Sequence, residues 1–444
     1  MIRRRSRTLP RQGERGVTMI LVALAMLSML AMVALAIDVI TLYSARSETQ
    51  RVADSAALAA AKVLVDSGQL TDPATYQANA QALAIQLAKD ISSQLTIAAR
   101  QVQAGDVSVA FSNGTGGPGV NPAVTVTVRN AYLPAFFSRI FSRANLTVSA
   151  SATAEAFTPT GAGGTIPVVS RCIKPFMIPN CDPMHAGAAC GSGATFFDPA
   201  SGAITNPGIA PAGVIGEEFE MYSNCGAGPT CVPGTPTVGP GSGGQPTLYY
   251  YPVQLPPTTD LCPSCYTGTT NFEQDTACCN PTPISCGSTA TLPVINQLTV
   301  DSVNPETGSS PVRWGLKCLI HQWGGTGEDT LLTGPPLTYP LQIQVGANHP
   351  LAGSVLSMND LVTTSDSLVT IPVYDPNYNG GTPPTTVNVI GFLQVFVEHV
   401  FPGSGVPKVG EFRVTVVNVL GCGNSASGAP VSSAAAVPIR LIHQ

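Results

Sequence analysis

Charged side chains are scarce in this 444-residue chain, where Asp, Glu, Lys and Arg together make up 11% against a usual value of about 25%. The chain has 21 Lys and Arg and 26 Asp and Glu. The first 16 residues take six of the basic and one of the acidic side chains, which leaves 15 and 25. This negative balance argues against nucleic acid as a partner of the main part of the chain.

Motifs of enzyme chemistry are also missing. The sequence has no HExxH pair, no GxSxG nucleophile elbow and no P-loop, which argues against catalytic zinc, a hydrolase serine and nucleotide binding. We therefore predict a non-enzymatic protein without a cofactor or a metal site. The acidic residues Glu217, Glu218 and Glu220 read as a solvated turn. The histidines are scattered, at His185, His321, His349, His399 and His443.

Cysteine is absent from the first 171 residues and then occurs twelve times. An even number, confined to one part of the chain, is typical of disulfides formed in an oxidising compartment. The candidates are Cys172, Cys181, Cys190, Cys225, Cys231, Cys262, Cys265, Cys278, Cys279, Cys286, Cys318 and Cys422.

The spacing Cys262-x-x-Cys265 leaves three interpretations open: structural disulfides, which we favour, a redox pair or a metal site. The context is a loop without the βαβ pattern of a thioredoxin-like fold. Cys278 and Cys279 are adjacent and are expected to pair with different partners.

One long apolar run is present, from Val17 to Ile37, and it carries no charge. As a helix it is ~32 Å long, which matches the hydrocarbon core of a bilayer. The arginine-rich leader 1–16 precedes it, so the positive-inside rule predicts a cytoplasmic leader, a transmembrane helix over 17–40 and a periplasmic body. A cleaved secretory signal is one alternative. Prepilin-type cleavage after Gly16 is another, although Leu21 stands where such precursors usually carry glutamate.

Residues 41–157 read as a helical hairpin followed by a small antiparallel sheet. The stripe Leu42, Ala45, Thr49, Val52, Ala56, Ala59 and Val63 predicts a heptad-like helix with small side chains at its seam. Asp72-Pro73 begins a second helix, with a stripe of Tyr76, Ala80, Leu83, Leu87, Ile91 and Leu95. The seam could pack within the chain or against partner helices. Alternating strands follow near 107–111, 124–128 and 146–152, with an aromatic helix near 133–141 that could cover the sheet or lie on a membrane.

The rest of the chain divides by composition. Residues 158–290 are rich in Gly, Pro and Cys, with little periodic apolar pattern, and are expected to depend on disulfides rather than on a core. Residues 291–444 carry recurring strand patterns, including the last one near 436–443, and suggest a β-sandwich-like domain. The predicted fold class is therefore α+β: one transmembrane helix, a hairpin-plus-sheet module, and a cysteine-rich and β-rich periplasmic region.

The N-terminal segment resembles the first module of the TadE/TadG-like family of Flp (tight-adherence) pilus-assembly proteins. The resemblance covers about 50 residues. The matching features are Gly16 at the membrane entry, the apolar run, and Asp38, Tyr43, Gln50, Ala53 and Asp54 before an alanine run that includes Ala56, Ala57, Ala59 and Ala60.

The resemblance implies an inner-membrane protein of a bacterial pilus or secretion system, with partners among the other assembly proteins. Some relatives carry a von Willebrand A domain with an Asp-x-Ser-x-Ser metal site. Asp366 is followed by one serine but lacks that spacing, so no such site carries over. A periplasmic thiol–disulfide enzyme using Cys262 and Cys265 and a pseudopilin-like subunit remain as alternatives.

Overall fold

The fold is described from a computed structural model. It describes residues 14–67, 69–70, 73–113, 121–134, 145–156, 168–185, 194–206, 209–223, 238–240, 245–257, 261–266, 268, 270–286, 297–300, 311–322, 327–332, 342–354, 356–362, 365–375, 386–401, 411–422, 431–433 and 439–442. Two compact units result. One contains residues up to Ala56 with 88–109 and 126–152, and the other contains 57–87, 110–125 and residues from Thr153 onward.

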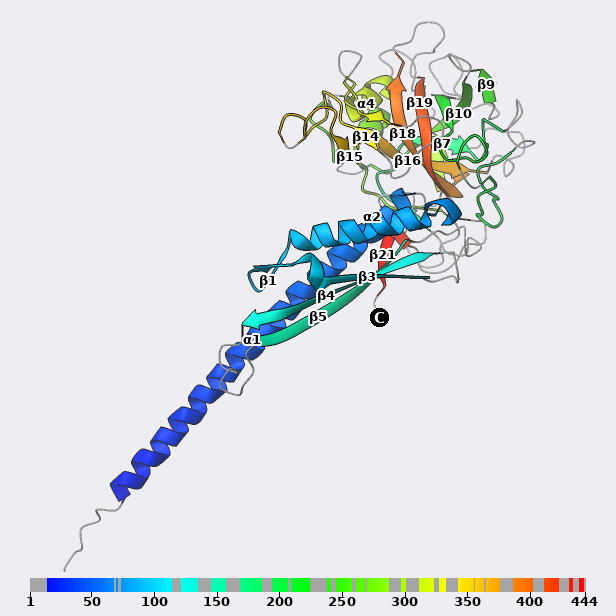
Figure 1. Ribbon diagram of the computed structural model, residues 1–444. Helices are drawn as coiled ribbons and strands as arrows, with labels where there is room; N and C mark the ends of the chain where they lie inside the picture. The colour runs from blue at the N-terminus through cyan, green and yellow to red at the C-terminus, as the bar shows by residue number, and fades with distance from the viewer. Residues whose placement is uncertain are drawn as a thin grey trace, which may run out of the picture. The chain divides into compact units, whose positions relative to one another are not determined.

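A single long helix, α1 (Glu14–Asp66), runs from the apolar segment into the following module without a break. The second helix, α2 (Pro73–Ser93), begins at the predicted proline. In the second unit, α2 lies alongside the end of α1 (Figure 1). Among residues 77–93 of α2, the buried side chains are small: Ala80, Ala84, Ala88 and Ser92.

A four-stranded sheet follows the hairpin, in the order β21-β5-β4-β3. Three of its strands are those predicted near the hairpin: β3 (Val107–Asn113), β4 (Pro122–Pro134) and β5 (Asn145–Ala156). The fourth, β21 (Ile439–Ile442), pairs antiparallel with Thr153–Ala156. The expectation that this last strand belongs to the C-terminal β-domain is therefore wrong. The predicted aromatic helix lies almost entirely outside the described residues.

The body is built around a closed ring of strands rather than a sandwich. β10 pairs with β7, β7 with β16, β16 with β18, β18 with β19, β19 with β8, and β8 returns to β10. The strands are β7 (Phe176–Pro179), β8 (Glu218–Ser223), β10 (Pro246–Gln254), β16 (Leu368–Tyr374), β18 (Gly391–Val400) and β19 (Phe412–Gly421).

The ring joins segments from both sides of the domain boundary expected at residue 290, so the structure does not divide the body there. Its interior is a large apolar cluster to which the cysteine-rich region contributes Phe176, Phe196, Phe219 and Tyr250. The expectation that this region buries little core is wrong. Its core residues come from short strands and turns, which give no long periodic pattern.

A second apolar cluster lies on the other side of several ring strands and includes Met177, Tyr251, Phe392 and Leu420. Because both faces of β18 and β19 are covered, these strands read as nearly continuous apolar runs instead of alternating ones. An inward-and-outward alternation could not have been read from them.

Smaller elements surround the ring. β9 (Val238–Pro240), β12 (Gln297–Val300) and β17 (Thr386–Asn388) extend the sheet at β10. Helices α3 (Asn271–Ala277) and α4 (Pro311–Leu319) pack together. The remaining pieces are β1 (Thr96–Ile97), β2 (Arg100–Gln101), η1 (Ala104–Asp106), β6 (Val168–Ser170), β11 (Ile284–Cys286), β13 (Thr330–Leu331), β14 (Ile343–Gln344), β15 (Leu361–Val362) and β20 (Val431–Ser433).

Candidate functional site: the N-terminal helix module

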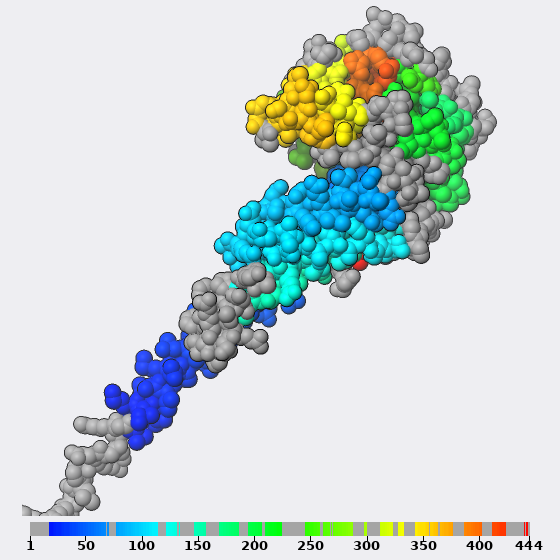
Figure 2. All heavy atoms as spheres, in the orientation of Figure 1, coloured from blue at the N-terminus to red at the C-terminus, as the bar shows by residue number. Residues whose placement is uncertain are grey.

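The first half of α1 is long and apolar enough to cross a membrane. Its large side chains are exposed, from Met19 at 77% to Ile40 at 68%. The first turns of α1 are dark blue in Figure 2. An apolar helix of this length is unfavourable in water, because its apolar side chains would be exposed to solvent. A bilayer or partner helices would therefore be expected to cover it.

Two residues interrupt this exposed stretch. Ala34 and Asp38 are one turn apart on the same face of α1 and are buried, at 9% and 4% exposed. The buried carboxyl of Asp38 lies one residue after the end of the uncharged apolar run. Tyr43, a few residues further on, is 71% exposed.

Side chains beyond the apolar run tie α1 to its own module. The Gln50 side-chain amide donates to Asp54 Oδ1 at 2.8 Å and to the Ser151 carbonyl in β5 at 3.3 Å. Glu48 accepts a hydrogen bond from the Ala98 backbone N–H at 2.7 Å. Gln50 thus joins α1 to β5, and Asp54 contacts Gln50 within the helix.

The alanine seam of α1 is buried, but its phase differs from the predicted heptad. Ala45, Thr49, Val52 and Ala56 are buried as expected. Further along, the predicted Ala59 and Val63 are only half-buried, and the buried positions become Ala53, Ala57, Ala60, Ala61 and Leu64. A straight helix has 3.6 residues per turn, so a 3.5-residue pattern drifts off the buried face within a few turns.

These observations define the class: a protein with one apolar, potentially membrane-spanning helix that continues into a small-residue helical hairpin and sheet. The comparison with protein families agrees. Residues 16–63 match Tad, described as "Putative Flp pilus-assembly TadE/G-like". No curated protein and no solved structure matches the chain. The match contains Gly16, Asp38, Tyr43, Gln50, Ala53, Asp54 and the buried alanines.

The described cysteines of the body are disulfide-bonded. The structure pairs Cys172 with Cys279, Cys262 with Cys278, Cys265 with Cys318, and Cys286 with Cys422. Cys181 is also in a disulfide, and none of the described cysteines is free. Cys190, Cys225 and Cys231 lie outside the described residues.

This pairing confirms that Cys278 and Cys279 have different partners. It also separates Cys262 from Cys265, because each is bonded to a distant cysteine instead of to the other. A CxxC redox centre needs those two sulfurs to form and break a shared bond. The structure therefore gives the thiol–disulfide alternative no redox pair at this motif.

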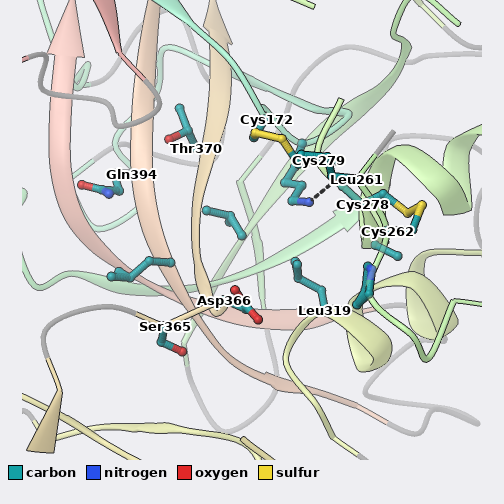
Figure 3. A pocket seen from close by; sticks show the side chains of 15 residues that line it. Cys172, Leu261, Cys262, Cys278, Cys279, Leu319, Ser365, Asp366, Thr370 and Gln394 are labelled. Atoms are coloured by element: carbon teal, nitrogen blue, oxygen red, sulfur yellow. Dashed lines mark hydrogen bonds between the residues drawn. A yellow bond between two sulfur atoms is a disulfide. The ribbon is translucent and has the colours of Figure 1, made fainter. Parts of the chain in front are cut away.

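Two of these disulfides border a cavity of about 440 Å³, lined by Cys172, Cys262, Cys278, Cys279, Lys174 and Asp366 among others (Figure 3). The Lys174 ammonium is buried and donates to the Cys278 carbonyl at 2.7 Å. Asp366 Oδ2 lies 3.0 Å from His321 Nε2, and this hydrogen bond lowers the pKa of Asp366.

The acidic residues near β8 are not a solvated turn. Glu217 and Glu220 are buried, at 2% and 0% exposed. Glu220 lies in β8 and its Oε1 contacts Arg413 Nη2 in β19 at 3.1 Å. Glu217 instead faces His185 and Asp182. The only local sign of this cluster is the spacing Asp182-x-x-His185, because Glu217 is far away in the chain.

Proposed function

We propose that this protein is a non-enzymatic component of Flp-type pilus assembly or a related secretion apparatus. In this proposal residues 17–40 anchor it in the bacterial inner membrane, the leader 1–16 is cytoplasmic, and the disulfide-bonded body is periplasmic. The observation that carries the proposal is the family match over residues 16–63, which spans both the apolar segment and the buried alanine seam of one continuous helix.

Two further features support it. The basic leader favours a cytoplasmic N-terminus, and the disulfides of the body require an oxidising compartment such as the periplasm. The exposed face of α1, with Tyr43 at its membrane-proximal end, is where partner transmembrane helices would pack. The body then serves as a scaffold outside the membrane.

Genetic replacement of the helix tests the proposal. Deleting the gene should abolish or reduce Flp pili or secreted product, and the full chain should restore them. A chain whose residues 17–40 are replaced by an unrelated apolar span should insert but fail to restore output. Full restoration by the unrelated span would show that this helix is only an anchor and has no specific partner.

Topology is tested separately with reporters. A periplasm-active reporter fused after Gln444 should be active, and replacing the six leader arginines should weaken the orientation. Activity of a cytoplasm-only reporter at the same junction would overturn the proposed topology. Mass spectrometry of the purified N-terminus addresses the pseudopilin alternative: we expect the leader to be retained, and a chain that begins at Val17 would favour processing after Gly16.

A further inference from the structure

Three ionisable side chains converge between the barrel strands β7 and β8. Asp182 lies three residues after β7, His185 follows it in a turn, and Glu217 immediately precedes β8. His185 Nδ1 lies 2.9 Å from Asp182 Oδ2 and 3.1 Å from Glu217 Oε1. One ligand atom from each residue lies within 4.8 Å of the other two.

The local backbone holds the first two residues in place. Asp182 is fully buried, and its Oδ1 accepts the backbone N–H groups of Met184 and His185 at 3.0 and 3.1 Å. This turn directs the other oxygen, Oδ2, toward the imidazole. The Asn206 side-chain amide also lies 3.5 Å from Oδ2.

Glu217 provides the strongest sign that a ligand belongs here. Its side chain is about 1% exposed, and neither carboxyl oxygen has a hydrogen-bond partner with normal geometry. The 3.1 Å contact with His185 is close in distance but does not have hydrogen-bond geometry. Leaving a buried carboxyl without partners costs free energy. The charged groups nearest to it are the His185 imidazole and the Asp182 carboxyl, whose ligand atoms lie within 4.8 Å of one of its own.

The orientation of His185 points the same way. Its Nε2 lies 3.3 Å from the Pro211 carbonyl oxygen, and a carbonyl can only accept, so Nε2 carries the hydrogen. In the neutral imidazole this leaves the lone pair of Nδ1 directed at two carboxyl groups. Metal-ligating histidines commonly have this arrangement, with one nitrogen on the metal and the other donating to a carbonyl.

We propose that Asp182, His185 and Glu217 bind a divalent transition-metal cation, with one ligand atom from each residue and Zn²⁺ as the best fit. Zinc–nitrogen and zinc–oxygen bonds are about 2.0–2.2 Å. Neighbouring ligands are then about 2.8–3.1 Å apart on an octahedral site and about 3.3–3.6 Å apart on a tetrahedral one. The 2.9 and 3.1 Å found here match the octahedral spacing. One imidazole among two carboxylates favours zinc over calcium, which prefers oxygen ligands alone.

The cation would connect the end of β7 to the start of β8, two strands that both neighbour β10 in the ring. The His185 side chain is 34% exposed, so solvent can reach the cluster from that side and water can complete the coordination. The site would thus stabilise the body, independently of what the N-terminal helix contacts. Its rival is a second proton on His185, which would bridge the same carboxylates without any metal.

Zinc titration of the purified full chain in detergent distinguishes the two. The disulfides are kept intact, the protein is stripped with a chelator, and Zn²⁺ alone is added in equilibrium dialysis with elemental analysis. We expect one Zn²⁺ per chain and a rise in melting temperature. Glu217→Gln and His185→Ala should each weaken binding at least tenfold, while the matched control Asp366→Asn, which removes a carboxylate from another His–Asp pair, should leave it unchanged.

Glu217→Gln keeps the side-chain shape and should melt like the unsubstituted chain when zinc is absent. If His185→Ala lowers the melting temperature without zinc, its loss of zinc binding could come from destabilisation. The zinc affinity of Glu217→Gln then decides whether the site exists. Absence of stoichiometric zinc binding, or zinc binding that Glu217→Gln leaves unchanged, would overturn the proposal and favour the protonated histidine. Calcium binding as tight as zinc binding would overturn the assignment to a transition metal.

Discussion

Close packing at single residues limits what the body can accept, and Gly315 in α4 is a clear case. A Cβ at this position would lie 2.8 Å from Thr276 Cβ and 3.0 Å from the Glu273 carbonyl oxygen, both in α3. These distances are well inside normal contact. The absence of a side chain at Gly315 is therefore what lets α3 and α4 approach each other.

Gly315→Ala should destabilise the protein by about 1–3 kcal/mol, the usual cost of overpacking. At an exposed position inside a helix, Gly→Ala instead stabilises the protein, by about 1 kcal/mol. The expected change in the free energy of unfolding at Gly315 therefore has the opposite sign. Gly105→Ala is the control, since nothing lies within 4 Å of its added Cβ. Thermal unfolding of both variants checks the prediction, and equal melting temperatures would contradict it.

The same scale explains why the acidic residues before and within β8 were misread. Runs of glutamate are usually solvated, and nothing near Glu217 or Glu220 in the sequence suggests burial. Arg413, which pairs with Glu220, and His185, the imidazole nearest to Glu217, are both distant in the chain. Only the pairing of β8 with β19 brings Arg413 opposite Glu220. Long-range strand pairing of this kind leaves no local pattern.

At the scale of elements, the described buried side chains are mostly small on both helices where α2 runs alongside the end of α1 (Figure 1). Ala57, Ala60, Ala80 and Ala84 are all 0% exposed. Small side chains let the two helix backbones come close together. A larger side chain at one of these positions would push the helices apart. Burial of these positions therefore explains the alanine run within the segment that matches the family.

Ala57→Leu should force these helices apart, destabilise the hairpin by about 1–3 kcal/mol and reduce pilus or secretion output. Ala59→Leu adds the same atoms at a half-buried position and should have a smaller effect. The comparison uses protease resistance of the purified chains and their ability to restore output in the deletion strain. Equal loss in both variants, with normal membrane insertion, would indicate that a partner covers Ala59.

Elements with local signals could be predicted from the sequence, whereas their assembly could not. The Pro73 start of α2 and the alternating Val124, Val126 and Val128 of β4 were visible, because capping and period-two patterns are local. The phase of the alanine seam was missed after Ala56. Alanine occupies nearly every position there, so the sequence shows no contrast between apolar and polar residues that would mark the buried face. At the candidate metal site, the Asp182 to His185 spacing was present but Glu217 was not recognisable.

The whole molecule depends on contacts between segments far apart in the chain. The ring begins with β7 near residue 176 and ends with β19 near residue 421, and the body's pairings include parallel neighbours such as β7 with β16. Composition suggested a boundary within this unit, since glycine-rich and strand-rich stretches alternate along the chain. Disulfides connect the same distant parts, and their contribution should increase with the length of chain they enclose.

Two disulfides offer a matched test of this dependence. Cys286–Cys422 closes a loop with a sequence separation of 136, and Cys262–Cys278 one of 16. If each bridge acts mainly by restricting the unfolded chain, the longer loop should stabilise by about 2 kcal/mol more than the shorter one. The Cys286→Ser/Cys422→Ser variant should therefore unfold at a lower denaturant concentration than Cys262→Ser/Cys278→Ser. Thiol counting in non-reducing denaturant should find few free thiols in either, which shows that the remaining bridges are intact. A greater loss from removing the short bridge would mean that native packing around the cavity, rather than loop length, governs the stability of the body.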